Sequence, residues 1–143
     1  MHDVEAAAHD PWAIAAKAGM TYFAIVFAAG FLLGTLRVLF IIPRLGETVA
    51  VALELPIILA LSWVACRWVT ARLDVPGTWI VRIMMGSFAF AVLMLAELGV
   101  STLAFGRSIP EHLEQYRELP ALLGLGAQIA FAIIPLAQIG SRR

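Results

Sequence analysis

The fold of this chain is decided by the stretch at positions 18–42, AGMTYFAIVFAAGFLLGTLRVLFII, in which Arg37 is the only charged residue. A helix that crosses the hydrocarbon core of a bilayer needs about 20 mostly apolar residues, and this stretch is long enough. Three further stretches of the same kind lie at 47–68, 78–105 and 119–140. All of them are too long for strands, and no alternating pattern suggests a barrel. The sequence therefore predicts four transmembrane helices.

The composition of the whole chain also indicates a membrane protein. Of its 143 residues, 62% are hydrophobic and 14% are charged, and the mean hydropathy is +0.90. A soluble domain is about 45–50% apolar and about 25% charged, so a water-soluble fold of this size could not bury so much apolar surface. The formal net charge of zero argues against a basic nucleic-acid-binding face. We expect one transmembrane domain over residues 1–143.

The connections between the helices predict how they are arranged. Residues 43–46 form a tight turn, which makes the first two helices antiparallel neighbours. Residues 73–77 form a second short turn, which predicts that helices two and three are neighbours as well. The third connection is expected to hold a surface helix at 108–118, because Ser108 and Glu111 match a capping box. The predicted fold is all-α, a transmembrane four-helix bundle of two antiparallel hairpins with a short surface helix between helices three and four.

Aromatic and basic residues near the helix ends predict how the chain lies in the bilayer. Trp12 and Tyr22 are expected near the interface, where amphipathic aromatic side chains are enriched. Arg67 and Arg82, each close to a tryptophan, are expected to extend toward the lipid headgroups. On the surface helix, an apolar face made of Ile109, Leu113 and Tyr116 is able to rest on the membrane, although the helix is too short and too acidic to bind lipid strongly.

The distribution of basic residues predicts the orientation of the helices. By the positive-inside rule, the richer side, with both termini and the second loop, is cytoplasmic. The acidic N-terminal segment lacks the features of a cleavable signal peptide, so we expect the first helix to remain in the mature protein. We expect a multi-pass protein of a bacterial inner membrane, surrounded by lipids and without a nucleic-acid partner. The richer side has Lys17, Arg67, Arg72, Arg82, Arg142 and Arg143, and the other has Arg44, Arg107 and Arg117.

A few polar side chains fall inside the predicted helices, where an ionisable group costs about 2.5–3.5 kcal/mol on insertion scales and normally has a partner. Arg37 and Glu54 lie equally far from the first turn and therefore at one depth. Glu97 and Gln128 fall at a similar depth in the second hairpin, roughly 10–13 Å below the outer boundary. We predict one intramembrane polar layer of these four residues. If Arg37 pairs with Glu54, then Glu97 is protonated, bound to a cation, or shares the arginine.

Two further features lie close to this layer. Arg44 and Glu47 are also equidistant from the first turn, which predicts a second ion pair nearer to it. Pro56 and Pro135 each remove a hydrogen bond within a helix, and Pro135 leaves the carbonyl of Phe131 without its usual donor. Freed carbonyls coordinate ions in some transporters, although a simple helix kink is the more common outcome.

The remaining residues carry no catalytic, cofactor or metal signature. A single cysteine, Cys66, rules out a disulfide within the chain, and His2, His9 and His112 lack a metal-ligand spacing. No nucleotide-binding loop, serine elbow, haem motif or zincin motif occurs. We therefore expect neither a metal ion nor a cofactor, and no catalytic residue is assigned.

Parts of the first two helices resemble a group of known proteins. The segments at 34–37, 43–47, 54–56 and 62–63 resemble small bacterial four-helix integral membrane proteins that are themselves uncharacterised. This resemblance supplies no function. The Glu-x-Pro at 54–56 is also similar to a pattern of the MAPEG family of membrane glutathione enzymes. The arginine and asparagine that precede the glutamate in that family are absent here.

Three functional interpretations remain open. We favour an accessory, assembly or scaffold subunit of a membrane complex, in which the polar layer fixes the register of the hairpins. The second is a proton or small-ion pathway that uses Glu97 in a homo-oligomer. The third is a membrane enzyme or a quinone-binding protein. Gly30 and Gly34 form a GxxxG pair that favours close helix contact, within the chain or between copies.

Overall fold

A computed structural model describes residues 10–142, and over that range it contains helices, turns and loops but no strand. His2, His9 and Arg143 lie outside the described residues. Four helical segments are long and apolar enough to cross a membrane, judged by length and composition. Segments η1 and η2 are π-helical, and η3 and η4 are 3-10 helices. The elements are α2 (Pro11–Leu36), η1 (Arg37–Ile41), α3 (Ile42–Leu45), α4 (Glu47–Arg72), α5 (Trp79–Gly99), η2 (Val100–Ala104), α6 (Ile109–Glu114), η3 (Gln115–Arg117), α7 (Leu119–Ala137) and η4 (Gln138–Arg142).

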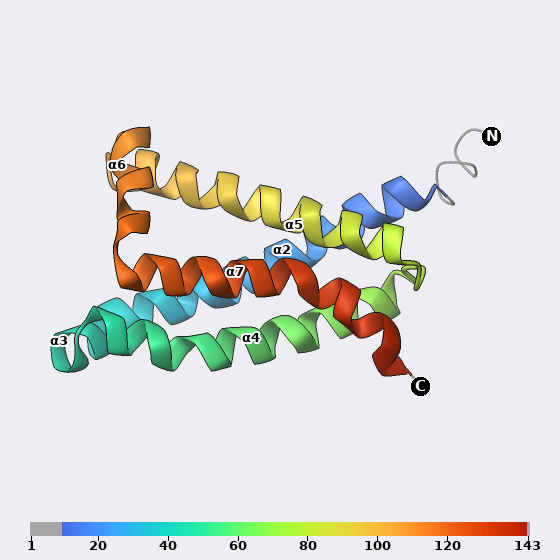
Figure 1. Ribbon diagram of the computed structural model, residues 1–143, viewed down its shortest axis with the longest axis horizontal. Helices are drawn as coiled ribbons and strands as arrows, with labels where there is room; N and C mark the ends of the chain where they lie inside the picture. The colour runs from blue at the N-terminus through green and yellow to red at the C-terminus, as the bar shows by residue number, and fades with distance from the viewer. Residues whose placement is uncertain (1–9, 143) are drawn as a thin grey trace.

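The four long helices pack into a bundle. From the end of the molecule that carries both termini, α2 leads to α3 at the far end and α4 returns, after which α5 and α7 repeat this course (Figure 1). Helix α2 packs against α4 and α5, and α7 packs against the same two helices. Helices α4 and α5 therefore lie on a diagonal, and the expectation that the second short turn makes them neighbours is wrong. Their connection includes extended residues 75–78, which span up to about 13 Å and so reach across the bundle.

Local capping explains where two helices begin. The side chain of Asp10 accepts a hydrogen bond from the Trp12 backbone N–H at 3.0 Å, and Pro11 occupies the first helical position. Helix α2 consequently begins at Pro11, the earlier start that an Asp10 N-cap and a first-turn proline indicate in the sequence, and the apolar stretch follows from position 18. The predicted capping box is confirmed, because the Ser108 N–H donates to Glu111 at 2.9 Å and the Glu111 N–H donates to the Ser108 hydroxyl at 3.3 Å.

The packed core occupies the half of the bundle nearest the termini. Its fully buried members include Ala18, Cys66 and Met85. The helices approach most closely at Gly86, where an added Cβ would collide with the Ala132 carbonyl of α7. A second close approach, at position 19, joins α2 to α5. Glycine permits both approaches because it lacks a Cβ atom.

Gly30 and Gly34, the predicted close-contact pair, do not mark a close approach of two helix backbones within the described bundle. A Cβ at these positions would have its nearest neighbours at 3.7 and 3.8 Å, and both neighbours are side-chain atoms. The pair instead faces open space between the helices, as described below.

Tyr22 lies in the core rather than at the interface, and its position explains how α7 tolerates a proline. The Tyr22 hydroxyl donates to the Phe131 carbonyl at 2.8 Å, and the two rings stack with centroids 4.3 Å apart. Pro135 removes the backbone N–H that would otherwise reach this carbonyl, so a buried side chain supplies the missing donor. Pro56 likewise lies inside a continuous helix, α4.

Arg82 is also placed differently from the expectation. Its side chain is only 1% exposed, and it donates from Nε to the Pro76 carbonyl at 3.1 Å and from Nη2 to the Val75 carbonyl at 3.3 Å. It thus holds the α4–α5 connection together instead of extending to headgroups. Arg67, on α4, is exposed as predicted.

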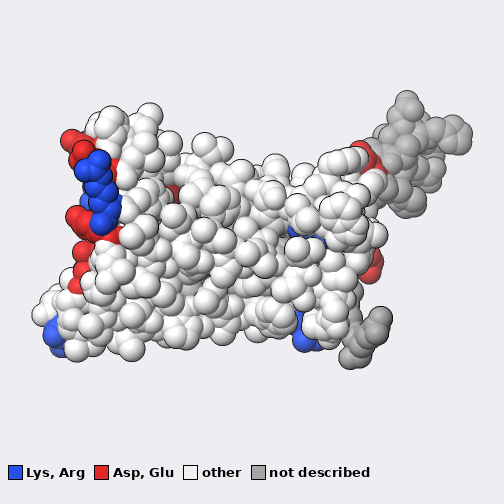
Figure 2. All heavy atoms as spheres, viewed as in Figure 1, with Lys and Arg blue, Asp and Glu red and all other residues white. Residues whose placement is uncertain are grey.

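The surface divides into charged ends and an uncharged middle. Figure 2 shows Lys, Arg, Asp and Glu gathered at the two ends of the bundle, with a broad band of other residues between them. Large apolar side chains are exposed over this band, among them Leu32, Leu95 and Ile133. Such a band has the composition expected of a surface that contacts lipid.

Candidate functional site

The half of the bundle away from the termini contains a partly open cavity of about 670 Å³. All four long helices line it, and its floor is formed by Val26, Ser62, Leu93 and Phe131, one buried residue from each helix. The packed core begins at this floor. The cavity volume falls within the range of about 300–1,000 Å³ that is typical of small-molecule sites.

Small residues on two helices create this space. Gly30 and Gly34 of α2 line the cavity, as do Gly124 and Ala127 of α7. A Cβ added at Gly124 would have no neighbour within 4 Å, so the wall is unfilled at this point. Gly30 and Gly34, which form a predicted helix-contact motif in the sequence, therefore contribute space to the cavity.

The predicted ion pair between Arg37 and Glu54 is confirmed. Arg37 Nη1 lies 2.9 Å from Glu54 Oε2, and the two side chains are 27% and 15% exposed. The pair joins η1 to α4 and lines the cavity. The Nε–H group of Arg37 is buried and has no hydrogen-bond partner among the described residues.

Glu97 and Gln128 also meet. Gln128 Nε2 donates to Glu97 Oε1, which joins α5 to α7 across the cavity wall. The four residues of the predicted polar layer thus line one cavity, but they interact as two separate pairs. Within residues 10–142, Glu97 forms no ion pair with Arg37.

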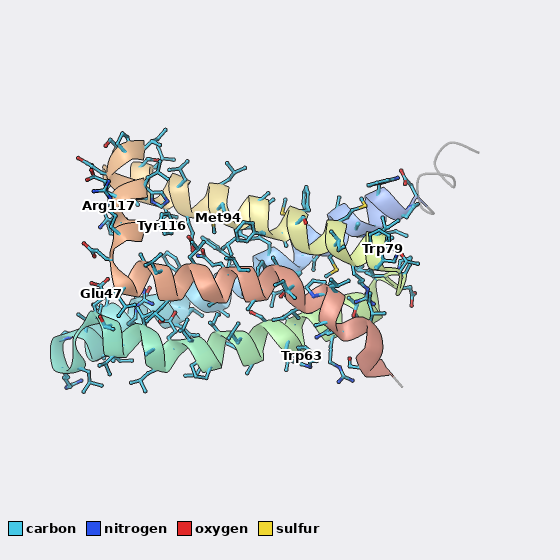
Figure 3. The ribbon with its side chains drawn as sticks, in the orientation of Figure 1. Glu47, Trp63, Trp79, Met94, Tyr116 and Arg117 are labelled. Atoms are coloured by element: carbon cyan, nitrogen blue, oxygen red, sulfur yellow. The ribbon has the colours of Figure 1, made fainter. Side chains whose placement is uncertain are left out.

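The connection between α5 and α7 covers the far end of the cavity. His112 of α6 and Tyr116 of η3 line it, with their rings edge to face at a centroid distance of 5.7 Å. Figure 3 shows Tyr116 in the space between α6 and the adjoining ends of α5 and α7. Tyr116 therefore faces inward, whereas Ile109 and Leu113 of the same connection remain exposed. The expectation that these three residues share one membrane-facing surface is wrong.

Glu97 interacts electrostatically with this cover. Its carboxylate acts on both His112 and Tyr116. Burial raises the pKa of the Tyr116 phenol above its ordinary value, and the negative charge of Glu97 raises it further. The partners of Glu97 are thus Gln128 and the cover, rather than the arginine on the opposite wall.

Two π-helical segments border the cavity, η1 with Arg37 and η2 with Ser101. Such segments are frequently found at functional sites, because they redirect side chains relative to a regular helix. Ser101 is only 5% exposed, and its hydroxyl has no partner among the described residues. His112 Nδ1 and Gln128 Oε1 are also buried without a hydrogen-bond partner among the described residues, and both residues line the cavity. These residues are candidate ligand contacts.

The predicted ion pair between Arg44 and Glu47 is absent from the described residues. Arg44 Nη1 donates instead to the Phe40 carbonyl at 3.0 Å. Equal distance from a turn predicts equal depth but not direction. The π-helical segment η1 changes the rotation of the residues that follow it, and Gly46 turns the chain with a φ of +81°.

Three lining residues, Ser101, His112 and Tyr116, were not predicted from the sequence as part of a site. The spacing of His112 and Tyr116, four apart on a short helix, was the only available signal. No group of three or more His, Cys, Asp and Glu side chains within the described range could hold a metal ion. No protein family, curated protein or solved structure matches this chain.

Proposed function

We propose that this chain is a multi-pass membrane protein that binds a small amphiphilic molecule in the half of the bundle away from its termini. The observation that carries the proposal is the cavity, whose lining combines many apolar side chains with the polar side chains of Arg37, Glu54, Glu97 and Gln128. A layer that served only to fix helix register would be expected to pack without space, because protein interiors are close-packed. An amphiphile supplies an apolar body for the walls and a polar group for the layer.

The proposed setting is a bacterial inner membrane with both termini in the cytoplasm. Helices α2 and α4 then form one antiparallel hairpin, and α5 and α7 form the other. The support is the excess of arginine and lysine at the end with the termini, together with the uncharged band in Figure 2. In this orientation the cavity lies in the outer half of the bilayer.

The proposed route of entry is sideways from the lipid. Four apolar side chains line the cavity and are each more than half exposed. They are Phe31, Val38 and Leu39, close to the turn of the first hairpin, and Phe105, directly after η2. These side chains mark a mouth between α2–η1 and the end of η2. An amphiphile dissolved in the bilayer reaches such a mouth without crossing water.

The other interpretations have less support. A proton or ion pathway requires a polar route across the whole membrane, and the packed floor at Val26, Ser62, Leu93 and Phe131 interrupts it. An accessory role in a larger membrane complex, with or without self-association, stays a prediction. Binding an amphiphile is compatible with either a free protomer or a subunit of a complex.

Native mass spectrometry of the purified protein, after incubation with a total membrane lipid extract, tests the proposal. Gly124→Phe places a ring in the cavity one turn from Gln128, whereas Gly126→Phe places the same ring on an exposed part of α7 that does not line it. We expect a small-molecule adduct on the wild type and on Gly126→Phe, and at least a tenfold loss with Gly124→Phe. An equal adduct on both variants, or none on the wild type, would contradict the proposal.

A further inference from the structure

We propose that the cavity takes a lipophilic cation and that Glu97 is its counter-charge. This inference rests on the proposed function and names the class of ligand. It begins from the charges that line the cavity, which are unequal. The lining includes four glutamates but only two arginines: Glu47, Glu54, Glu97, Glu118, Arg37 and Arg107.

The excess of negative over positive side chains is least compensated at Glu97. On the opposite wall, Arg37 is already matched by Glu54. Glu97 has Gln128 as its hydrogen-bond partner, and an amide provides a donor but no positive charge. From the cover, His112 and Tyr116 interact with the carboxylate, and Arg107 of the same connection lines the cavity without forming an ion pair with Glu97 among the described residues. An ionised carboxylate in a low-dielectric site is costly without a counter-charge, so a bound cation stabilises it.

The oxygen atoms around Glu97 also suit a cation. Ser101 follows Glu97 by one turn, is 5% exposed, and has a hydroxyl without a hydrogen-bond partner among the described residues. The carbonyl oxygen of Gln128, beside the same carboxylate, also lacks a donor among the described residues. Both residues line the cavity, so their oxygen atoms lie close to an occupant at Glu97. An anionic headgroup would instead be repelled by the Glu97 carboxylate.

The walls suit a cation with a large apolar surface. Phe27, Phe31, Tyr116 and Phe131 line the cavity and come from α2, η3 and α7. A cation over an aromatic face gains about 0.5–1 kcal/mol at exposed sites and about 2 kcal/mol when desolvated. A small hydrated ion gains little from such walls, whereas a lipophilic cation uses both the rings and the carboxylate.

Three probes of similar shape and different charge provide the test: the tetraphenylphosphonium cation, the tetraphenylborate anion and neutral triphenylphosphine oxide. Binding is measured by equilibrium dialysis of the protein in dodecyl maltoside, with protein-free micelles subtracted. We expect the phosphonium to bind at least tenfold more tightly than the borate. Glu97→Gln should weaken phosphonium binding at least tenfold and change that of the neutral probe less than threefold. Glu118→Gln, at the exposed rim, should change phosphonium binding less than threefold.

The outcomes separate this inference from the proposed function. If the neutral probe or the borate binds wild type as tightly as the phosphonium, and Gly124→Phe abolishes that binding, the cavity binds amphiphiles but the cation is wrong. An unchanged phosphonium affinity in Glu97→Gln also overturns the inference. If none of the probes binds, and Gly124→Phe does not reduce the small-molecule adduct in native mass spectrometry, both proposals fail. The wild-type charge preference decides the question even if Glu97→Gln does not fold.

Discussion

Replacing Tyr22 by phenylalanine tests whether a side-chain hydroxyl compensates for the proline inside α7. The substitution keeps the ring that stacks on Phe131 and removes only the donor that reaches the Phe131 carbonyl at 2.8 Å. A buried acceptor left without a donor costs about 1–3 kcal/mol. Hydrogen bonds between membrane helices average about 0.6 kcal/mol and reach about 1.7 kcal/mol. Because Tyr22 is fully buried and Pro135 removes the usual donor, we expect a loss of about 1.5 kcal/mol.

The decisive experiment is a double-mutant cycle with Pro135→Ala, measured by reversible unfolding in mixed dodecyl maltoside and dodecyl sulfate micelles. Alanine at position 135 restores a backbone N–H that can donate to the Phe131 carbonyl. Tyr22→Phe should then cost no more than about 0.5 kcal/mol, which leaves a coupling energy of about 1 kcal/mol. In a Pro56→Ala background, the cost of Tyr22→Phe should stay at about 1.5 kcal/mol. An equal cost in all three backgrounds would show that the hydroxyl does not replace the missing donor.

Three further predictions concern the charged and titratable groups. Arg37→Glu and Glu54→Arg should each lower the free energy of unfolding by about 1–3 kcal/mol, and the double variant should recover much of this loss in the same micelle assay. Independent losses that simply add would argue against a pair. Arg82→Leu should lower the free energy of unfolding by more than about 3 kcal/mol, because it removes both hydrogen bonds to the α4–α5 connection. Slower proteolysis of this connection in the variant than in the wild type would count against the role of Arg82. The folded protein holds the Tyr116 proton more tightly than the unfolded chain, so its contribution to stability is complete below the ordinary phenol pKa of 10.0 and declines as the pH rises above it. Glu97→Gln should lower that raised pKa in ultraviolet titration with Tyr116→Phe as the blank, and an unchanged titration would exclude the charge of Glu97 as a cause.

The sequence predicted the Arg37–Glu54 pair, and the common depth of Glu97 and Gln128, because depth follows from counting residues away from a turn. Each residue of a helix advances the chain by about 1.5 Å, so equidistant residues of two antiparallel helices share a level. Arg37 and Glu54 meet at such a level. The same counting placed Glu97 and Gln128 at one depth, and they are hydrogen-bonded.

The direction of a side chain could not be predicted in the same way. A membrane helix is apolar on nearly all sides, so its sequence does not distinguish a lipid-facing side from a core-facing side. For this reason Tyr22 and Arg82 were assigned to the membrane interface, although the bundle buries both. The failed pairing of Arg44 with Glu47 has a related cause, since the intervening π-helical turn has no recognised sequence signal.

The cavity could not be predicted because an unfilled space results from the arrangement of several helices. Gly30 and Gly34 resemble contact residues in the sequence, and only the courses of α2 and α7 through the bundle place them, together with Gly124, beside the space. The cover depends on where the α5–α7 connection folds back, which brings His112 and Tyr116 over Glu97.

The division of the bundle at its floor has a consequence for how the protein tolerates sequence change. The core and the cavity draw largely on different stretches of each helix and meet around the four floor residues. Substitutions at distant sites without shared partners usually act additively. Changes near Gly124 are thus free to alter the shape of the pocket while contacts around Met85 continue to maintain the fold. Specificity in one half of the protein is able to evolve without a corresponding loss of stability in the other.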